Sequence, residues 1–448
     1  MHRRIVDILR DLKRDPARLL DRPAILDLRR RAGHSWRTSF FDPVATIHTF
    51  LLQILHGNTA INHLPRLTHQ AFTASAYCQA RARLPLEVFE DLVRLVADSL
   101  HSATKDTGRW LGHRVFVLDG SAFSMPDTPE LQNHFGQTRA QRPGCGFPIA
   151  HLLALFHVGT GMLLDVLSGP LYTHDMADAA RLHPRLESGD VLLGDRGFCS
   201  FAHLALLVER GVQGVFRLHQ RQIADFTPHR PHKPPGRKKG SKGRPSSRWL
   251  RALGVTDQVV AWIKPKTCPE WMTAEQYASL PEELEVRELR YQLDRPGFRA
   301  HVVTLATTLL GPGLYSVEAL ATLYQSRWGV ELNLRHLKTT MKMDVLRCET
   351  VAGVSKELLM YALAYNLVRL VMVEAASRQG VAVDRISFVD ALRWLSEARP
   401  GDSLPVLVVN PERPDRIEPR VRKRRPKSYP LMTKPRSVLR KELTDTTS

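Results

Sequence analysis

The strongest constraint on the fold is the alternation of strand-like and helix-like runs between His113 and Leu218. VFVLD, IAHLLALFHV, GMLLDVL, VLLGD and VQGVFRL have the length and apolar content of buried strands. DMADAARLHPRL and FAHLALLVERG, which stand between them, have apolar residues at helical spacing. A Gly-Thr-Gly turn at residues 159–161 separates the second and third runs and predicts a hairpin. This alternation is typical of a mixed α/β sheet with helices packed on its faces.

The segments on either side of this region have different patterns. Residues 1–108 contain VATIHTFLLQILHG and PLEVFEDLVRLVADSL, whose apolar residues recur at helical spacing and predict a helical N-terminal domain. Residues 229–248 crowd Pro, Gly, Ser and bases together and predict a flexible basic loop. The end of the chain, from Pro411 onward, contains PRVRKRRPKSYPLMTKPR, which predicts an irregular basic tail.

The chain carries a large excess of positive charge. Lys and Arg number 64 against 45 Asp and Glu, which gives a formal net charge of +19. This excess favours nucleic acid as a partner, because phosphates relieve the self-repulsion of the bases; the alternative is a charge that serves solubility alone. The five cysteines lie far apart without a CxxC pair, and no run approaches 18 apolar residues. We therefore expect a protein of the reducing cytosol with no signal peptide and no membrane span.

A long helix, predicted from about residue 317 to 343, carries an unusual polar stripe. Four side chains at offsets of three, seven and fourteen fall within an arc of about 60°: Tyr324, Arg327, Glu331 and Lys338. Arg335 lies close to this stripe. An adjoining apolar face can pack on the sheet and consists of Leu323, Val330, Leu334, Leu337 and Met341. The alternative is a solvated face on which Glu331 pairs with Arg327 or Arg335.

Two further carboxylates occupy matching places in the predicted sheet. Asp119 closes the strand VFVLD, and Asp195 closes the strand VLLGD. Each alone is explained about as well by a turn or a helix cap. Catalytic groups collect at strand ends in α/β folds, however, and Glu331 from a packed helix can reach the same point. We therefore predict that the three carboxylates form one site.

Three carboxylates at one point repel one another unless a cation joins them. Hard oxygen ligands select Mg²⁺ or Mn²⁺, and two such ions are suited to in-line attack on phosphorus. Arg327, Arg335 and Lys338 are then candidates to hold DNA phosphate oxygens, and Tyr324 to donate a hydrogen bond to the backbone.

Three other aspartates compete for a place among the metal ligands. Asp165 lies inside the strand GMLLDVL, while Asp175 and Asp178 begin a predicted helix. Acids at a helix start are ordinary capping or dipole residues. We therefore rank all three below Asp119 and Asp195.

These residues resemble a known family. Tyr324, Arg327, Glu331 and Lys338, with two, three and six residues between them, match the Tyr-Arg-Glu-Lys signature of the DDE transposases of bacterial insertion sequences, in the IS-four group. LDGSAFSMPDTPELQNHFG resembles the segment with that family's first Asp, and GDRGFCSFAHL the segment with its second. The resemblance covers about residues 110–345 and extends more weakly to KRRPKSYPLMTKPR.

The resemblance implies a domain organisation. It consists of a ribonuclease-H-like catalytic core formed by 109–218 and 313–400, a β-rich insertion with the basic loop at 219–312, a helical N-terminal domain at 1–108 and a basic C-terminal tail at 401–448. It also implies that Asp119, Asp195 and Glu331 are the metal-binding catalytic triad. Some relatives stack a flipped base on a Trp of the insertion. Trp262 and Trp271 are the candidates here, and a core position explains each of them at least as well.

The function implied is that of a DNA transposase. Such an enzyme binds the terminal inverted repeats of its element, cuts there with two Mg²⁺ or Mn²⁺ ions and joins the 3′-hydroxyls to target DNA, with no covalent protein intermediate. We expect a homodimer on double-stranded DNA, end recognition by residues 1–108, and a cytoplasmic, nucleoid-associated location. The alternatives are a stand-alone ribonuclease-H-like nuclease or resolvase, which would not join strands, and a catalytically silent DNA-binding protein.

Overall fold

The computed structural model describes residues 6–7, 9–10, 14–36, 39–173, 175–232, 243–293, 302–399, 401–412 and 432–445. Residues 233–242 of the predicted basic loop and residues 413–431 of the predicted basic tail lie outside the described residues.

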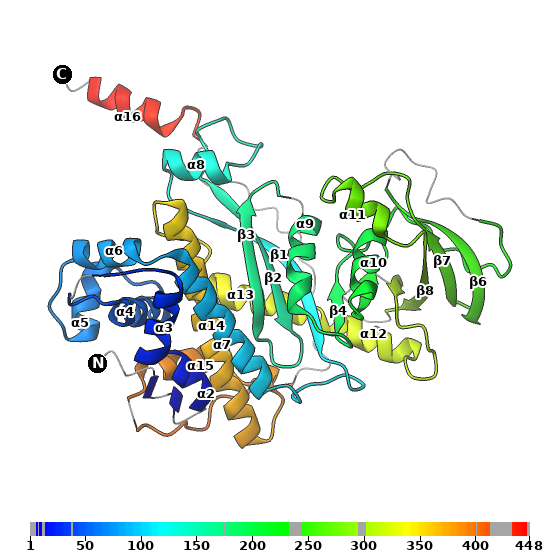
Figure 1. Ribbon diagram of the computed structural model, residues 1–448, viewed down its shortest axis with the longest axis horizontal. Coiled ribbons are helices and arrows are strands. Elements are labelled where there is room, and N and C mark those ends of the chain that lie inside the picture. The colour runs from blue at the N-terminus through cyan, green and yellow to red at the C-terminus, as the bar shows by residue number, and fades with distance from the viewer. Residues whose placement is uncertain are drawn as a thin grey trace.

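The described residues form one nine-stranded sheet in the order β3-β2-β1-β4-β5-β9-β8-β7-β6 (Figure 1). Its strands are β1 Val115–Ser124, β2 Ile149–His157, β3 Leu163–Pro170, β4 Val191–Gly194, β5 Gln213–Arg217, β6 Ser246–Gly254, β7 Asp257–Ile263, β8 Glu283–Gln292 and β9 Val302–Thr307. β1 pairs antiparallel with β2 but parallel with β4, and β4 pairs parallel with β5. The prediction of a mixed α/β sheet is confirmed.

The strands β6 to β9 continue this sheet and do not form a separate one. β9 pairs antiparallel with β5, and β8, β7 and β6 follow outward as antiparallel neighbours. In Figure 1 they form the end of the molecule opposite the N-terminal helices. The segment between Arg217 and Val302 is therefore joined to the rest of the sheet by backbone hydrogen bonds through β9.

Helices cover both faces of the sheet and form the N-terminal end of the molecule (Figure 1). Their bounds are α2 Arg14–Leu19, α3 Arg22–Arg31, α4 Pro43–Leu55, α5 Leu64–Thr68, α6 Ala74–Arg83, α7 Leu86–Ala103, α8 Pro129–Phe135, α9 Asp175–Leu182, α10 Phe201–Glu209, α11 Ala274–Ser279, α12 Val317–Ser326, α13 Gly329–Arg335, α14 Val351–Gln379, α15 Phe388–Glu397 and α16 Arg436–Asp445. α7, α13 and α14 contact the strands from one side, and α9 and α10 pack on β2, β3 and β5.

The two faces of β1 belong to two separate hydrophobic clusters. Val115, Val117 and Phe123 pack with α7 and α14 in one cluster, whereas Phe116 and Leu118 pack with α9 and α10 in the other. Side chains alternate across a strand, so residues of odd number in β1 face the first cluster. This parity decides which face Asp119 occupies.

The central helix α14 holds the N-terminal helices to the sheet. It begins at the N-cap Thr350, whose side chain accepts a hydrogen bond from the N–H of Gly353, and it ends at Gly380 with φ +65°. The buried Glu357 accepts hydrogen bonds from the side chain of Asn58 (2.5 Å) and from the N–H of Cys348 (2.9 Å). α14 is long and apolar enough to cross a membrane, yet 89% of its most apolar window is buried inside the structure, as expected of a core helix.

The structure corrects two predicted element boundaries. β1 does not end at Asp119, because β2 pairs with it residue for residue from Phe116 to Ser124. The single helix predicted for 317–343 is interrupted: α12 ends at Ser326, α13 begins at Gly329, and a π-helical turn covers His336–Thr340. The end of the predicted irregular tail also contains a helix, α16.

Candidate active site

Asp119 and Asp195 extend from neighbouring parallel strands toward the same face of the sheet. Asp119 follows Val117 at an interval of two in β1, and Asp195 follows Leu193 at an interval of two past the end of β4. Val117 and Leu193 both belong to the cluster beneath α13 and α14, so both carboxylates start on that face. Asp195 accepts a hydrogen bond from the N–H of Gly197 (2.7 Å), and Asp119 one from the N–H of Gly120 (2.9 Å).

Glu331 brings a third negative charge to this place. It lies on α13, the helix that contacts β1, and its side chain is exposed. The pKa of Asp119 is raised to about 6, mostly by burial and in smaller part by the charges of Asp195 and Glu331, whereas Arg327 and the Gly120 N–H oppose the rise. The three predicted carboxylates therefore lie close enough to influence one another.

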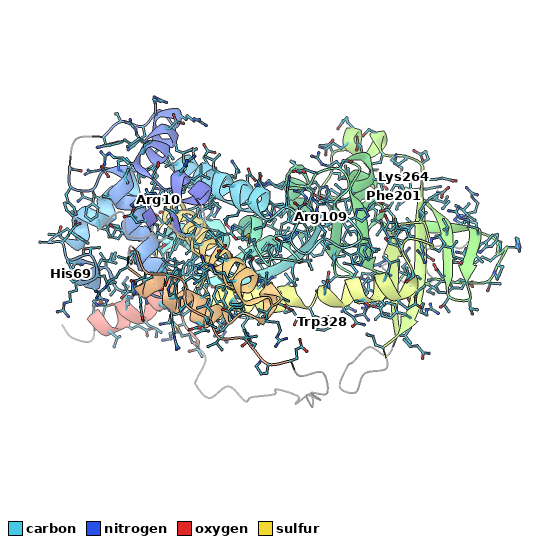
Figure 2. The ribbon with its side chains drawn as sticks, turned by 90° about the horizontal axis from the view of Figure 1, so that it is seen from below. Arg10, His69, Arg109, Phe201, Lys264 and Trp328 are labelled. Carbon is cyan, nitrogen blue, oxygen red and sulfur yellow. The ribbon has the colours of Figure 1, made fainter. Side chains whose placement is uncertain are left out.

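Arg327 and Tyr324 stand beside the carboxylates. Nη1 of Arg327 lies 4.0 Å from Oδ2 of Asp119, and its guanidinium lies 5.7 Å from the centre of the Tyr324 ring and 5.4 Å from that of Trp328. The Nε of Arg327 is buried without a hydrogen-bond partner in the structure. Trp328 lies at the surface where α12 and α13 meet (Figure 2). Burial raises the pKa of Tyr324 to about 12, so its hydroxyl keeps its proton at neutral pH and remains a donor.

Lys338 reaches the strand that bears the first carboxylate. Its Nζ donates a hydrogen bond of 2.8 Å to Oγ of Ser121, two residues after Asp119 and on the same face of β1. Burial lowers the pKa of Lys338 from its ordinary value, and the nearby Asp344 opposes the shift. The interrupted helix therefore still delivers Tyr324, Arg327 and Lys338 to one side of β1.

Sequence reasoning missed two residues of this surface. Arg217 ends β5, the parallel neighbour of β4, and its charge acts on both Tyr324 and Tyr291. The hydroxyl of Tyr291 is buried without a hydrogen-bond partner, and burial raises its pKa to about 12. Arg217 lies at the carboxyl end of a parallel strand, beside the strand of Asp195. Functional side chains collect at such strand ends, and this position could have identified Arg217 as a candidate.

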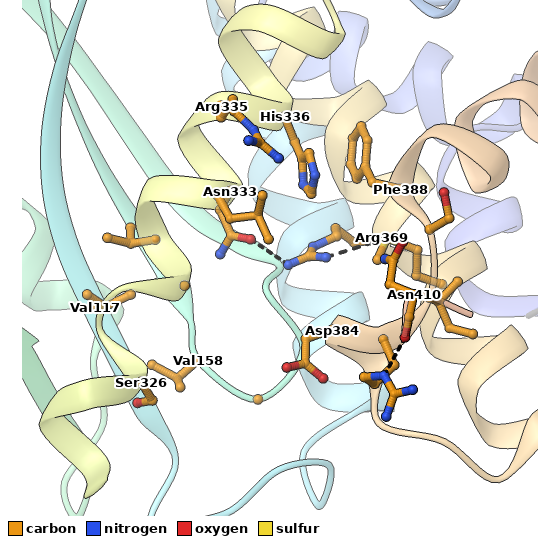
Figure 3. A pocket seen from close by; sticks show the side chains of 18 of the residues that line it. Val117, Val158, Ser326, Asn333, Arg335, His336, Arg369, Asp384, Phe388 and Asn410 are labelled. Atoms are coloured by element: carbon orange, nitrogen blue, oxygen red, sulfur yellow. Dashed lines mark hydrogen bonds between the residues drawn. The ribbon is translucent and has the colours of Figure 1, made fainter. Parts of the chain in front are cut away.

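The structure does not bring Arg335 to this site. Arg335 lines a cavity of about 890 Å³ between α13, α14 and the segment after α15. Figure 3 shows it above Asn333 and beside His336, on the wall that faces Arg369 and Phe388. The π-helical turn begins directly after Arg335. Arg335 therefore lies on the wall of a cavity that also includes Val117, two residues before Asp119 in β1.

The competing aspartates are engaged elsewhere. Asp165 accepts a hydrogen bond from the N–H of Val166 and pairs with Arg185 at 3.3 Å. Asp175 lies 2.7 Å from Nε2 of His151. Asp178 is buried and pairs with Arg181 at 2.9 Å.

Of the two tryptophans, one is excluded from stacking on a base. Trp262 is fully buried, and its Nε1 donates to Glu288 at 2.9 Å. Stacking would expose it and leave a buried carboxylate without that donor, so Trp262 is a core residue, the alternative that the sequence left open. Trp271 lines a cavity of about 310 Å³ together with Arg196, which directly follows Asp195.

The donor chemistry of the site fits a hard divalent cation. Three carboxylates with a raised pKa at Asp119 carry excess negative charge that a cation would neutralise. In the described part of the chain, no three acidic, His or Cys side chains converge closely enough to hold a metal ion. Asp119, Asp195 and Glu331 thus share a site through their charges, and a metal ion requires them to move closer.

Comparison with known proteins places the chain in a family. Residues 110–367, more than half of the chain, match the family model for the transposase DDE domain. The transposase InsG for insertion sequence element IS4 of Escherichia coli strain K12 is 29% identical over 381 residues, 80% of this chain and 78% of that protein. The putative transposase InsZ of the same strain is 26% identical over 178 residues, 39% of this chain and 56% of that protein.

A solved structure of the piggyBac transposase synaptic complex with hairpin DNA aligns with 87% of this chain and 77% of its own, at a TM-score of 0.41 and 10% identity. The family match spans all three carboxylates and the Tyr-Arg-Glu-Lys signature. The predicted resemblance is therefore confirmed, and the chain belongs to the DDE transposase family.

Proposed function

We propose that this DDE transposase cuts DNA at the terminal inverted repeats of an insertion sequence and joins the 3′-hydroxyls to target DNA. The observation that carries the proposal is the placement of Asp119 and Asp195 on the face of the sheet that α13, with Glu331, packs against. Burial raises the pKa of Asp119, and the charges of Asp195 and Glu331 add to the rise. A protein that only binds DNA gains nothing from three carboxylates facing phosphate. Catalysis of phosphoryl transfer needs them as ligands.

We assign Asp119, Asp195 and Glu331 as ligands of two Mg²⁺ or Mn²⁺ ions. When bound, such ions activate a water or 3′-hydroxyl and stabilise the leaving oxygen. The protein's own part is to hold the carboxylates on two strands and one packed helix, and to place Arg327 opposite Asp119. Arg327 then balances part of the negative charge before DNA arrives.

We further assign Tyr324, Arg327, Lys338 and Arg217 to the phosphates next to the cut. Tyr324 is a hydrogen-bond donor at neutral pH. Nη1 of Arg327 lies 4.0 Å from Asp119, too far for a strong hydrogen bond, so a phosphate oxygen can compete for this guanidinium. The contact of Lys338 with Ser121 is a single neutral hydrogen bond, which a phosphate can replace.

A ribonuclease-H-like core is the fold that suits this site. The strands β3-β2-β1-β4-β5 present both aspartates on one face, and the strands β6 to β9 act as an insertion. We also propose end recognition by the N-terminal helices, a homodimer that holds two DNA ends, and a cytoplasmic location at the nucleoid. The net charge of +19 supports a large contact with DNA.

The test uses a supercoiled plasmid that carries the genomic DNA flanking the gene. Wild-type protein and the Glu331→Ala and Glu318→Ala variants are incubated with Mg²⁺, Mn²⁺ or EDTA, and the breaks are mapped. Glu318 is the matched control, because it is an exposed glutamate of α12 in the same segment. We expect metal-dependent breaks and joined products with wild type and Glu318→Ala only. Equal cleavage by Glu331→Ala would remove Glu331 from the mechanism.

A further inference from the structure

Arg369 of α14 is a buried charge without a charged partner. The residue is only 5% exposed. Its Nε donates to the backbone oxygen of Gly161 at 3.0 Å, its Nη2 to Oδ1 of Asn333 at 2.6 Å, and its Nη1 to Sδ of Met372 at 3.4 Å. These three acceptors are neutral, and no carboxylate of the described residues pairs with the guanidinium. Since a buried charge is costly unless it is paired, an anion beside Arg369 would be bound favourably.

The guanidinium of Arg369 is held at the wall of the cavity of about 890 Å³ that Figure 3 shows. Gly161 lies directly against it, because a Cβ at this position would be 1.4 Å from Nη2 of Arg369. An arginine has five N–H donors, so the three contacts leave N–H groups that can bind a ligand. Cavities that hold small molecules have volumes of roughly 300–1,000 Å³. This cavity is therefore large enough for a ligand of several groups.

Two neighbouring side chains have hydrogen-bond donors available in the same cavity. Nδ1 of His336 is buried without a hydrogen-bond partner, and the ring stacks on Phe388 at 4.3 Å between ring centres. Burial, followed by the charges of Arg369 and Arg335, lowers the pKa of His336 to about 3, so the ring is neutral at pH 7 and can carry its proton on Nδ1. Oδ1 of Asn333 accepts from Arg369, which leaves its Nδ2 as a donor. Figure 3 shows these side chains around one space.

The charges on the cavity wall also favour an anion. Among the lining residues that the structure describes, the bases are Arg335, Arg369 and Arg385, and the one acid is Asp384. Arg385 is already paired with Glu412. Asp384 is exposed, so water screens its negative charge better than it screens the positive charge of the buried Arg369. The wall therefore keeps a positive potential where the free donors lie.

We propose that this cavity binds a nucleotide through its phosphate, with the phosphate oxygens on Arg369, Asn333 and His336. The three side chains converge as donors only, and a phosphate group supplies several acceptor oxygens for them. Val158 and Met372 of the same wall can cover the sugar or the base. A free nucleotide and a DNA strand both contain this group. The inference does not rest on the proposed function, because none of the three catalytic carboxylates lines the cavity.

The test is equilibrium dialysis of the full-length protein in EDTA against radiolabelled deoxyadenosine monophosphate. Deoxyadenosine is the matched ligand, because it lacks only the phosphate. We expect the monophosphate to bind about tenfold or more tightly than deoxyadenosine, since hydrogen bonds between arginine and phosphate are charge-assisted. A short single strand of DNA without terminal phosphates is then added as a competitor. Displacement of the monophosphate shows that the cavity also takes the phosphate of a DNA strand, and no displacement shows that it takes a free nucleotide.

Four variants locate the bound phosphate. Arg369→Gln should weaken binding of the monophosphate by about tenfold or more and leave deoxyadenosine unaffected. His336→Phe keeps an aromatic ring to stack on Phe388 but loses the donor, and should weaken binding by about threefold to tenfold. Asp384→Asn should instead tighten binding by about threefold, because it removes a negative charge from the wall. Arg393→Ala, at an exposed arginine of α15 outside the cavity lining, is the control and should bind as wild type does.

Several results would overturn the inference. They are an absence of monophosphate binding by wild type at millimolar concentration, equal binding of the monophosphate and deoxyadenosine, or affinities that His336→Phe and Asp384→Asn leave unchanged. Binding that Arg327→Ala removes and the cavity variants do not would place the nucleotide at the carboxylate site instead. Asp384→Asn replaces an exposed side chain, so the test still decides the matter if Arg369→Gln does not fold.

Discussion

Nη1 of Arg327 lies 4.0 Å from Oδ2 of Asp119, where the segment that joins α12 to α13 meets β1. This distance allows electrostatic attraction without a strong hydrogen bond. Arg327 is therefore a local counter-charge that can turn toward a phosphate when a metal ion neutralises Asp119.

Replacing Asp119 with Asn should stabilise the metal-free protein while it abolishes cleavage. The pKa of Asp119 is raised from 3.8 to about 6 in the folded protein. The folded protein therefore loses stability as the pH rises from 3.8 to 6, because the unfolded chain gives up this proton more readily. At pH 7.5 in EDTA the variant should be more stable by on the order of 2 kcal/mol, measured by urea unfolding. At pH 3 the gain should vanish. Asp127→Asn, which breaks the pair with Arg436, is the control and should not gain stability.

Divalent metal should stabilise wild type more than the carboxylate variants. A ligand that binds only the folded state raises its stability by RT ln(1 + [L]/Kd), about 2.7 kcal/mol at a hundred times Kd. We expect Mn²⁺ to raise the melting temperature of wild type and to have little effect on Asp119→Asn or Glu331→Gln. An equal rise in all three proteins would place the bound metal elsewhere.

Arg327 and Arg335 form a matched pair that tests the geometry of the site. Both are arginines of the same segment, but Arg327 faces Asp119 and Arg335 lines the separate cavity of Figure 3. Arg327→Ala should slow cleavage at the DNA ends by about a hundredfold or more. Arg335→Ala should change it by less than about threefold. Single-turnover cleavage rates decide the matter, and a larger loss with Arg335→Ala would contradict the placement.

Two buried histidines should make the protein sensitive to acid. Nε2 of His183 lies 2.8 Å from Nε2 of His203, and burial lowers the pKa of His183 to about 2 and of His203 to about 4. Below pH 6.5 the unfolded chain binds protons that these folded histidines do not, so stability is lost as pH falls toward 4.

The measurement is the free energy of unfolding at pH 7 and pH 5. Each histidine should contribute a loss of roughly 2 kcal/mol over this interval. His203→Gln should reduce the loss even if it lowers stability at pH 7. The control, His232→Gln at an exposed histidine, should leave the loss of unfolding free energy between pH 7 and pH 5 unchanged. If His203→Gln does not alter this loss either, the acid sensitivity does not come from the buried histidine pair.

The sequence predicted those parts of the fold that depend on local pattern. Asp195 follows a strand, as predicted. The run VLLG is short and apolar, which is typical of a buried strand, and the polar DRG that follows ends it. The apolar face predicted for residues 317–343 is buried, from Leu323 to Met341. Each of these two features depends on residues that are close together in the sequence.

Features that depend on distant partners were not predictable in the same way. Asp119 lies inside β1 because β2, some thirty residues later, pairs with the strand as far as Ser124. The break between α12 and α13 is marked in the sequence only by Gly329, whose cost of about 1 kcal/mol in a helix is often tolerated. The strand that Arg217 ends was predicted, but its place beside the strand of Asp195 arises from the pairing of β5 with β4.

The most direct test of the central claim is to map where a bound metal ion lies. Fe²⁺ accepts the same oxygen ligands as Mn²⁺, and with ascorbate and peroxide it breaks the protein backbone next to its ligands. The account predicts breaks near Asp119, Asp195 and Glu331, which excess Mn²⁺ suppresses and which Asp119→Asn loses. Breaks near Asp165, Asp175 or Asp178 instead would contradict the assignment of the catalytic carboxylates.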